Sequence, residues 1–138
     1  MRNPAVLRAV PQPESAMRHC LIVDDSRIVR KVARRILEEF ELDVSEADDG
    51  SIALDLCRRQ MPDAILLDGH VPSVPASEFL RALRREVGGD KPFVIFCAIE
   101  TDVSQLTEAV AAGANDYLLK PYDRNILLAK LSEIGLLE

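Results

Sequence analysis

The sequence predicts an α/β fold in which five parallel strands alternate with five helices. Two observations support this prediction. Short apolar segments of strand length alternate along the chain with longer segments whose apolar residues recur at helical spacing. In addition, the segments at 19–25, 63–68 and 91–98 are almost continuously apolar. Such segments are typical of strands in a parallel sheet that helices cover on both faces.

The first strand and helix are defined by their ends. Residues 19–25 (HCLIVDD) form an apolar strand that ends in two aspartates. Ser26 is a suitable N-cap for a helix over 26–40, because its side chain can accept a hydrogen bond from an unpaired amide of the first turn. The apolar positions expected to face the core are Val29, Val32, Ala33, Ile36 and Phe40.

The next three elements complete the first half of the chain. Alternating apolar and polar residues predict the second strand at 42–47. A helix follows at 50–60 and ends before Pro62, since proline is unfavourable inside a helix. The third strand lies at 63–68 and ends in an aspartate.

The second half of the chain adds two strands and three helices. The strands are predicted at 91–98 and 115–121, and the helices at 75–89, 101–114 and 122–138. The first two of these helices end at glycines, which readily adopt the left-handed conformation found after a helix. The last helix is amphipathic.

These units can be arranged in few ways. Connections between parallel strands are right-handed almost without exception. Five successive strand–helix units favour a flavodoxin-like (βα)5 sheet, doubly wound and five-stranded, in the order 2-1-3-4-5. The chain has no internal repeat, and 138 residues leave no room for a second domain.

Length and composition are ordinary for a globular protein. Hydrophobic residues make up 48% of the chain and charged residues 29%, and the net charge is −6 at pH 7. Such acidity disfavours non-specific binding to nucleic acid. Residues 1–17 contain three prolines and no periodicity, so we expect a flexible N-terminal extension there and one domain over 18–138.

The sequence predicts a cytoplasmic protein with no membrane span. No apolar run approaches the roughly 18 residues that cross a bilayer. The N-terminal segment also lacks the apolar core of a signal peptide. Cys20, Cys57 and Cys97 fall inside apolar patterns, so we expect them to be buried and reduced.

Several charged residues lie at the predicted carboxyl ends of strands. Asp24 and Asp25 end the first strand and Asp68 ends the third, while Lys120 ends the fifth. In this fold, ligands bind at that edge where the strand order reverses, so the three carboxylates are expected to converge. Oxygen ligands without Cys or His favour Mg²⁺. Each residue alone would be an ordinary turn, cap or solvated charge; the argument rests on their combination.

Four motifs identify a family resemblance. They are LIVDDS at 21–26, ILLDGHVP at 65–72, SEFLRALR at 77–84 and AAGANDYLLKP at 111–121. With them, nearly all of 18–138 resembles a response-regulator receiver domain of two-component signalling. Because no output domain follows in this sequence, the chain resembles a stand-alone receiver of the chemotaxis type.

The resemblance implies a role for each residue of the acidic pocket. Asp68 would be the phosphoacceptor, and Lys120 would contact the phosphoryl group. Mg²⁺ would be bound by Asp25, Asp68 and the backbone carbonyl of His70, and Asp24 would hold a metal-bound water. A carboxylate is a weak nucleophile, so its attack on phosphohistidine needs this neutralisation of charge by metal and lysine.

One departure from the family concerns a missing hydroxyl. Receivers normally carry Thr or Ser at the end of the fourth strand, whereas this strand ends in FCAIE. The spacing to Asp68 and Lys120 places Ala98 at the hydroxyl position, and a shift by one would place Cys97 there. Ile99 replaces the usual small neighbour. A lost hydrogen bond to a charged group is worth on the order of 1.5–3 kcal/mol, and part of the conformational trigger is lost with it.

Further departures surround the acceptor. The family's Met-Pro-x-Met-Asp-Gly loop is replaced by VPSVPA at 71–76, which predicts a stiffer loop. His70 occupies a position that tunes phosphoryl lifetime in the family, and we favour a polar rim residue over a base. Tyr117 resembles the family's switch aromatic, although a half-buried strand tyrosine fits the sequence equally well.

The predicted first helix has a basic face. Its residues are Arg27, Arg30, Lys31, Arg34 and Arg35. A solvated face is the ordinary explanation. In the family this helix helps to dock the histidine kinase or phosphotransfer protein, and a nucleotide is a third possible ligand.

Three functions are consistent with parts of this sequence. The first is a stand-alone receiver that accepts phosphoryl from a histidine kinase or phosphotransfer protein and signals to a downstream protein target, without a DNA-binding output domain and without being an enzyme. The second is a degenerate receiver that binds partners independently of phosphorylation, which Ala98 favours. The third is a haloacid-dehalogenase-like phosphohydrolase, which we discount because His70 stands where that class needs an acid.

Overall fold

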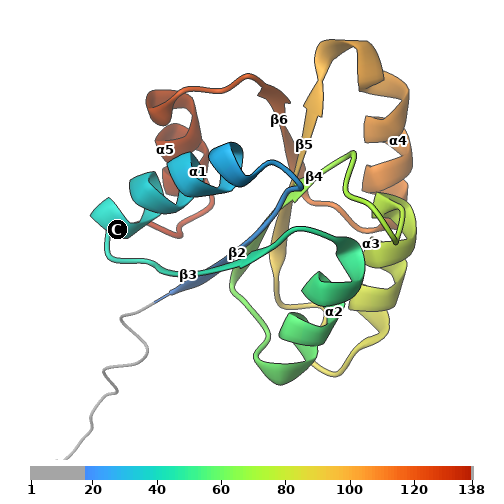
Figure 1. Ribbon diagram of the computed structural model, residues 1–138. Helices are drawn as coiled ribbons and strands as arrows, with labels where there is room; N and C mark the ends of the chain where they lie inside the picture. The colour runs from blue at the N-terminus through green and yellow to red at the C-terminus, as the bar shows by residue number, and fades with distance from the viewer. Residues whose placement is uncertain (1–17, 138) are drawn as a thin grey trace, which may run out of the picture.

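A parallel sheet forms the centre of the molecule, with helices on both of its faces (Figure 1). The computed structural model describes residues 18–137. The extension expected at 1–17 lies outside the described residues. Within the described part, no helix is both long and apolar enough to cross a membrane.

The sheet has the predicted topology. Its strands are β2 (His19–Val23), β3 (Asp43–Ala47), β4 (Ala64–Asp68), β5 (Phe93–Ile99) and β6 (Asp116–Lys120). All neighbouring pairs are parallel, and the order across the sheet is β3-β2-β4-β5-β6. This is the 2-1-3-4-5 order expected from the sequence, which is therefore confirmed.

The helices form two layers, one on each face of the sheet (Figure 1). In chain order they are α1 (Arg27–Glu39), α2 (Gly50–Arg59), α3 (Ala76–Arg85), the 3-10 turn η2 (Glu100–Asp102), α4 (Val103–Ala112) and α5 (Arg124–Glu133). Buried residues of α1 and α5 pack on one face, and those of α2, α3 and α4 pack on the other.

Strand residues alternate between the two layers. In β5, for example, Phe96 and Ala98 contact the layer of α2, α3 and α4, whereas Ile95 and Cys97 contact the layer of α1 and α5. Because helices cover both faces of the central strands, these strands are apolar almost throughout rather than alternating. The three cysteines are buried and form no disulfide, as the sequence predicts.

The helix starts are set by local hydrogen bonds. The Ser26 hydroxyl accepts from the Val29 amide at 3.2 Å, which confirms the predicted N-cap of α1. Asp49 and Asp123 cap α2 and α5 in the same way. Each such cap stabilises a helix by about 1 kcal/mol. The predicted glycine end of α4 is also confirmed, since Gly113 has φ +130° there.

Two predicted helices are too long. The helix expected over 75–89 ends at Arg85, because Glu86 turns to an extended conformation with ψ 155° before the glycines are reached. The helix expected over 122–138 spans only Arg124–Glu133. Gly135, with φ +80°, lies just beyond this helix.

The predicted apolar face of α1 is also partly wrong. Ala33 and Ile36 are buried as expected, together with Leu37. Val32, however, is 54% exposed and Phe40 is 40% exposed. The face that packs on the sheet is narrower than the apolar pattern indicates, so α1 leaves an apolar strip in contact with solvent.

Arg84, near the C-terminal end of α3, connects this helix to the loop before β5 and to the loop before β6. Its guanidinium donates to the carbonyl oxygens of Gly113 at 2.7 Å, Gly89 at 2.9 Å and Pro92 at 2.9 Å, and to the Asn115 side chain at 2.9 Å. No carboxylate takes part in these bonds. Arg84 therefore acts as a structural clamp that satisfies the backbone of two loops.

We expect Arg84→Met to lower the free energy of unfolding by about 2–3 kcal/mol, because several carbonyl groups lose a charged donor. Arg81→Met is the matched control, since Arg81 is exposed on the same helix and its replacement should cost no more than about 0.5 kcal/mol. Urea unfolding of the two variants measures the difference. Equal losses in both would show that the clamp has no special role.

A buried histidine should make the free energy of unfolding depend on pH. His19 is 8% exposed, its Nε2 lies 2.7 Å from the Ser45 hydroxyl, and its Nδ1 has no partner among the described residues. Burial lowers the pKa of His19, and this effect outweighs the opposing charges of Asp43 and Asp63. The charge of Lys91 acts in the same direction as burial.

The sign of this effect follows from proton binding. Because the pKa of His19 is lower in the folded protein than in the unfolded chain, the unfolded chain binds the proton first as pH falls. The free energy of unfolding should therefore decrease between about pH 7.5 and about pH 5.5. His19→Gln should reduce that decrease, as measured by urea unfolding at both pH values. An unchanged pH dependence would contradict this assignment.

Candidate functional site

The site lies at the carboxyl edge of the sheet, between β2 and β4. The chain leaves β2 through α1 on one face of the sheet and leaves β4 through α3 on the other. This divergence opens the edge that binds ligands in doubly wound folds. Asp24 directly follows β2, Asp68 is the last residue of β4 and Lys120 is the last residue of β6.

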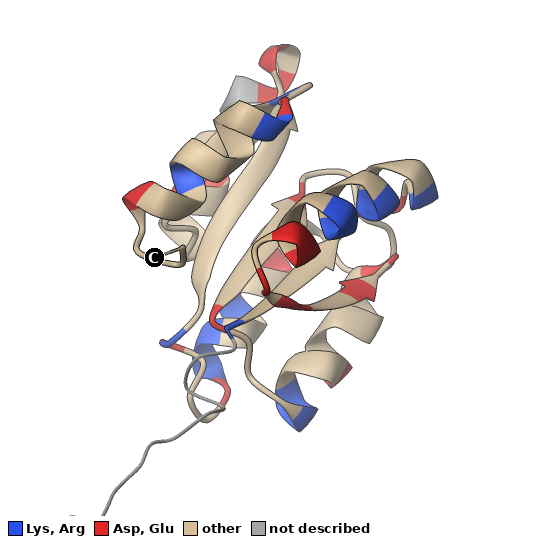
Figure 2. Ribbon diagram, turned by 90° about the vertical axis from the view of Figure 1, so that its left-hand side faces the viewer, with Lys and Arg blue, Asp and Glu red and all other residues tan. Residues whose placement is uncertain are grey.

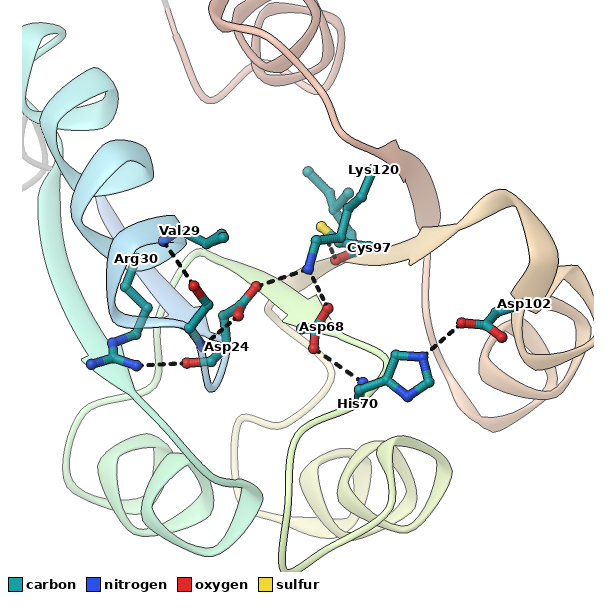
Figure 3. Close-up of polar contacts among 10 residues, drawn as sticks. Asp24, Val29, Arg30, Asp68, His70, Cys97, Asp102 and Lys120 are labelled. Atoms are coloured by element: carbon teal, nitrogen blue, oxygen red, sulfur yellow. Dashed lines mark hydrogen bonds and ion pairs between the residues drawn. The ribbon is translucent and has the colours of Figure 1, made fainter.

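Three of the predicted residues meet there (Figure 3). The Lys120 ammonium lies 2.7 Å from Asp68 Oδ1 and 3.3 Å from Asp24 Oδ2. Asp24 and Asp68 are each only 4% exposed. Lys120 therefore bridges two buried carboxylates that come from strands on either side of the crevice.

Backbone amides hold the remaining carboxylate oxygens. The Ser26 amide donates to Asp24 Oδ1 at 2.9 Å, and the His70 amide donates to Asp68 Oδ2 at 3.1 Å. Both donors lie two residues beyond the aspartate that they contact, so each loop turns back onto its own acid. The two carboxylates are consequently fixed in direction as well as position.

Burial and the neighbouring charges shift the pKa values of Asp24 and Lys120. Burial raises the pKa of Asp24, and the neighbouring Asp68 charge acts in the same direction, against the hydrogen bonds from Ser26 and Lys120. Burial alone would lower the pKa of Lys120, but the hydrogen bonds and charges of Asp68 and Asp24 raise it. Lys120 is therefore a permanent cation that offsets part of the negative charge.

A third carboxylate completes a cluster suited to a metal ion. Asp24, Asp25 and Asp68 each offer an oxygen within 4.8 Å of the others, and Asp25 is exposed to solvent. These are hard oxygen donors, which suit Mg²⁺. The nearby Cys97 is no competing ligand, because burial raises the pKa of its thiol and keeps it neutral. The donor set thus fits the ion that the sequence predicts.

The side chain of His70 points away from Asp68. Its Nε2 lies 2.6 Å from Asp102 Oδ2, across the rim of the site, and more than half of its side chain is exposed (Figure 3). The contact joins the loop after β4 to the start of α4. The sequence suggested a rim position for His70 but contained no signal for Asp102, which lies 32 residues away.

The residues of the expected switch have different environments. Ala98 is 5% exposed and packs in the core layer of α2, α3 and α4. Ile99 is 44% exposed and lines an apolar groove beside Lys120. Tyr117 is 45% exposed on β6, outside the core. No hydroxyl is present at either Cys97 or Ala98, the two candidate positions for it.

The loop after Asp68 is fixed against the start of α2. The Gly50 amide donates to the Pro72 carbonyl at 3.2 Å, and the Val74 amide donates to the same carbonyl at 2.9 Å. A Cβ at Gly50 would lie 2.9 Å from Val74 Cβ, so only glycine permits this approach. Ser73 takes a left-handed φ of +71° at the turn. These contacts agree with the stiff loop expected from the sequence.

The basic face of α1 is divided into two parts. Arg30 and Arg34 are partly buried and both pair with Glu46 of β3. Arg27, Lys31 and Arg35 are exposed, and the basic residues recur along the helix in Figure 2. The sequence pattern did not separate these groups, because the partner of Arg30 and Arg34 lies on another element.

A family model agrees with this geometry. The model described as the response regulator receiver domain matches residues 20–132. Response regulator MprA of Mycobacterium sp. (strain KMS) is 40% identical over 111 residues, which are 80% of this chain and 47% of MprA. MprA of Mycobacterium leprae (strain TN) is also 40% identical, over 48% of its length. The chain thus spans about half the length of these relatives.

Solved structures show the same architecture. The chemotaxis response regulator CheY4 of Vibrio cholerae superposes with a TM-score of 0.80 at 29% identity, covering 86% of this chain and 98% of CheY4. The receiver domain of sensor histidine kinase PA1611 from Pseudomonas aeruginosa PAO1 has a TM-score of 0.78 at 27% identity, over 85% of this chain and 96% of that domain. That structure contains a magnesium ion in its active-site cleft.

The family match, the strand order and the placement of Asp24, Asp68 and Lys120 at one edge of the sheet agree with one another. The chain belongs to the response-regulator receiver domain family.

Proposed function

We propose that this receiver accepts a phosphoryl group on Asp68 from a histidine kinase or phosphotransfer protein, and then signals through contact with a downstream protein. The observation that carries the proposal is the contact between Asp68 Oδ1 and the Lys120 ammonium at 2.7 Å, inside a cluster of three carboxylates. A lysine in this position can transfer its hydrogen bond from the carboxylate to an incoming phosphoryl oxygen.

The chemistry requires little of the protein beyond positioning. An oxygen of Asp68 forms a bond to phosphorus as the bond from phosphorus to the donor's imidazole nitrogen breaks, and the electron pair of that bond remains on the imidazole. A bound Mg²⁺, held by Asp25, Asp68 and the carbonyl of His70, would neutralise negative charge on the phosphoryl oxygens. Lys120 neutralises charge from the other side, and Asp24 keeps Lys120 directed at the acceptor.

The surface beside the acceptor supports docking of a protein donor. Ile28 and Val32 of α1 are 75% and 54% exposed and line the groove next to Lys120, together with Ile99. Arg27 and Lys31 are exposed on the same helix. We propose that these two cations provide most of the electrostatic attraction to the donor, since Arg30 and Arg34 are already paired with Glu46.

A second candidate function is a degenerate receiver that binds its partners without phosphorylation. The observation in its favour is the absence of a hydroxyl at Ala98. In the family, a Thr or Ser hydroxyl at this position forms a hydrogen bond to the phosphoryl group and moves with it. The intact set of Asp24, Asp25, Asp68 and Lys120 favours the first function. Neither candidate is a conventional enzyme: in the first, Asp68 itself is the group that is modified, and in the second, the domain only binds its partners.

Phosphorylation of Asp68 can be measured directly. Incubation with a small phosphodonor and Mg²⁺ should add the mass of one phosphoryl group to the wild-type protein, as seen by intact mass spectrometry. Asp68→Asn should add none, and Lys120→Ala should react more slowly because the charge on the phosphoryl oxygens is then less compensated. If the wild type stays unmodified with both a small donor and a phosphotransfer protein, the degenerate receiver is the better description.

The missing hydroxyl should limit the response to phosphorylation. Ala98→Thr combined with Ile99→Ala should enlarge the amide chemical-shift changes around Tyr117 when a beryllium fluoride phosphoryl mimic binds. The reason is that the threonine adds a contact made only in the active state, and about 1.4 kcal/mol changes the ratio of the two states tenfold. Ile99→Ala alone is the control. If wild type and double variant respond equally, the hydroxyl is not the limiting feature.

A further inference from the structure

One side chain links the acidic loop to the edge strand of the sheet. Arg30 Nη1 donates to the backbone carbonyl of Asp24 at 2.8 Å (Figure 3). Arg30 Nε donates to Glu46 Oε1 on β3 at 3.0 Å. The side chain of Arg30 is only 15% exposed, so this contact is shielded from solvent. The guanidinium therefore connects the loop after β2 to a fixed point on the sheet.

The carbonyl that Arg30 contacts has particular importance. It belongs to the peptide unit that joins Asp24 to Asp25, and such a unit is planar and rigid. The Asp24 amide is bound to the Ala47 carbonyl at 3.1 Å, so that end of the residue is also fixed. Once the plane between the two aspartates is fixed, the direction in which Asp25 leaves the loop is restricted. This matters because Asp25 is exposed and has little packing to hold it.

Arg30 is itself held in place by a shared acid. Glu46 receives hydrogen bonds from both Arg30 and Arg34. Burial acts to raise the pKa of Glu46, but these two arginines outweigh it and lower the pKa, so Glu46 is ionised at neutral pH. Arg34 also donates to the Val44 carbonyl at 3.1 Å, and none of its hydrogen bonds within the described residues reaches the acidic loop. Two arginines thus share one acid, and one of them reaches the Asp24–Asp25 peptide.

We propose that Arg30 is a positioning residue for the metal site: by fixing the peptide plane between Asp24 and Asp25, it holds the two carboxylates in the arrangement that binds a divalent cation. This role rests on the metal site described in the proposed function. Arg30 touches neither the acceptor nor the ion, and it acts only through the loop. Glu46 completes the arrangement by fixing Arg30.

The proposal predicts an effect opposite in sign to that of simple electrostatics. A guanidinium beside an acidic cluster repels a divalent cation, so removal of its charge alone would strengthen metal binding. Loss of its hydrogen bond to Asp24 would instead leave the Asp24–Asp25 peptide less restricted and weaken binding. The direction in which Arg30→Gln changes the affinity for a divalent cation therefore distinguishes a positioning role from an electrostatic one.

The experiment measures affinity for Mn²⁺ as the probe, from the electron paramagnetic resonance signal of the unbound ion, at a temperature well below unfolding. Arg30→Gln should weaken binding about tenfold, the lower end of the range for groups that orient metal ligands. Arg30→Lys should also weaken it, because one ammonium cannot reproduce the two-armed contact although the charge remains. A Mg²⁺ titration followed by the Asp25 and Gly69 amide shifts provides a second readout.

Arg34→Gln is the matched control. Like Arg30→Gln, this substitution removes a residue of α1 that pairs with Glu46, but it leaves the contact between Arg30 and Asp24 intact. The Mn²⁺ affinity of Arg34→Gln should therefore stay within about twofold of wild type. If the Mn²⁺ affinity falls equally in both variants, the cause is a general loss of packing between α1 and β3. If Arg30→Gln binds Mn²⁺ more tightly, the role of Arg30 is purely electrostatic. Either result overturns the inference. Wild-type protein that binds no Mn²⁺ at millimolar concentration would overturn the metal site itself, whereas normal binding by wild type and Arg30→Gln alike would overturn only the role of Arg30.

Discussion

Two carboxylates that are almost fully removed from solvent stand beside one another at the edge of the sheet, and the surrounding structure is arranged to compensate them. Asp24 and Asp68 are each 4% exposed, and Lys120 contacts both. Buried charges are costly unless they are paired and hydrogen-bonded. Removing one member would leave the others uncompensated, so the three residues form one unit. A divalent cation is a ligand that can enter such a unit and offset its negative charge.

The loops around this unit are fixed to different degrees. The acidic loop is held by the Asp24 amide, its carbonyl and both of its carboxylate oxygens. The loop after β4 is pinned to Gly50 at the start of α2. The end of β5, by contrast, offers only the apolar side chains of Ala98 and Ile99. The loops that carry Asp24 and Asp68 are thus held by polar contacts, whereas neither Cys97 nor Ala98 at the end of β5 has a hydroxyl.

Two features of the described surface lie close to this unit. The apolar groove lined by Ile28, Val32 and Ile99 is also lined by Lys120. The contact between His70 and Asp102 joins the loop after β4 to the start of α4. This contact is a direct physical link between the loop that follows Asp68 and that helix.

The sequence by itself determined the strand order, the buried cysteines and the meeting of Asp24, Asp68 and Lys120. These depend on local periodicity and on the rule that parallel strands end at one edge, both of which can be read along the chain. Only the tertiary structure decided that Val32 is exposed, that Arg30 and Arg34 share Glu46, that His70 turns to Asp102, and that Arg84 clamps two loops. Each of these depends on which way a side chain points and on a partner from another segment, and no local pattern of residues specifies either.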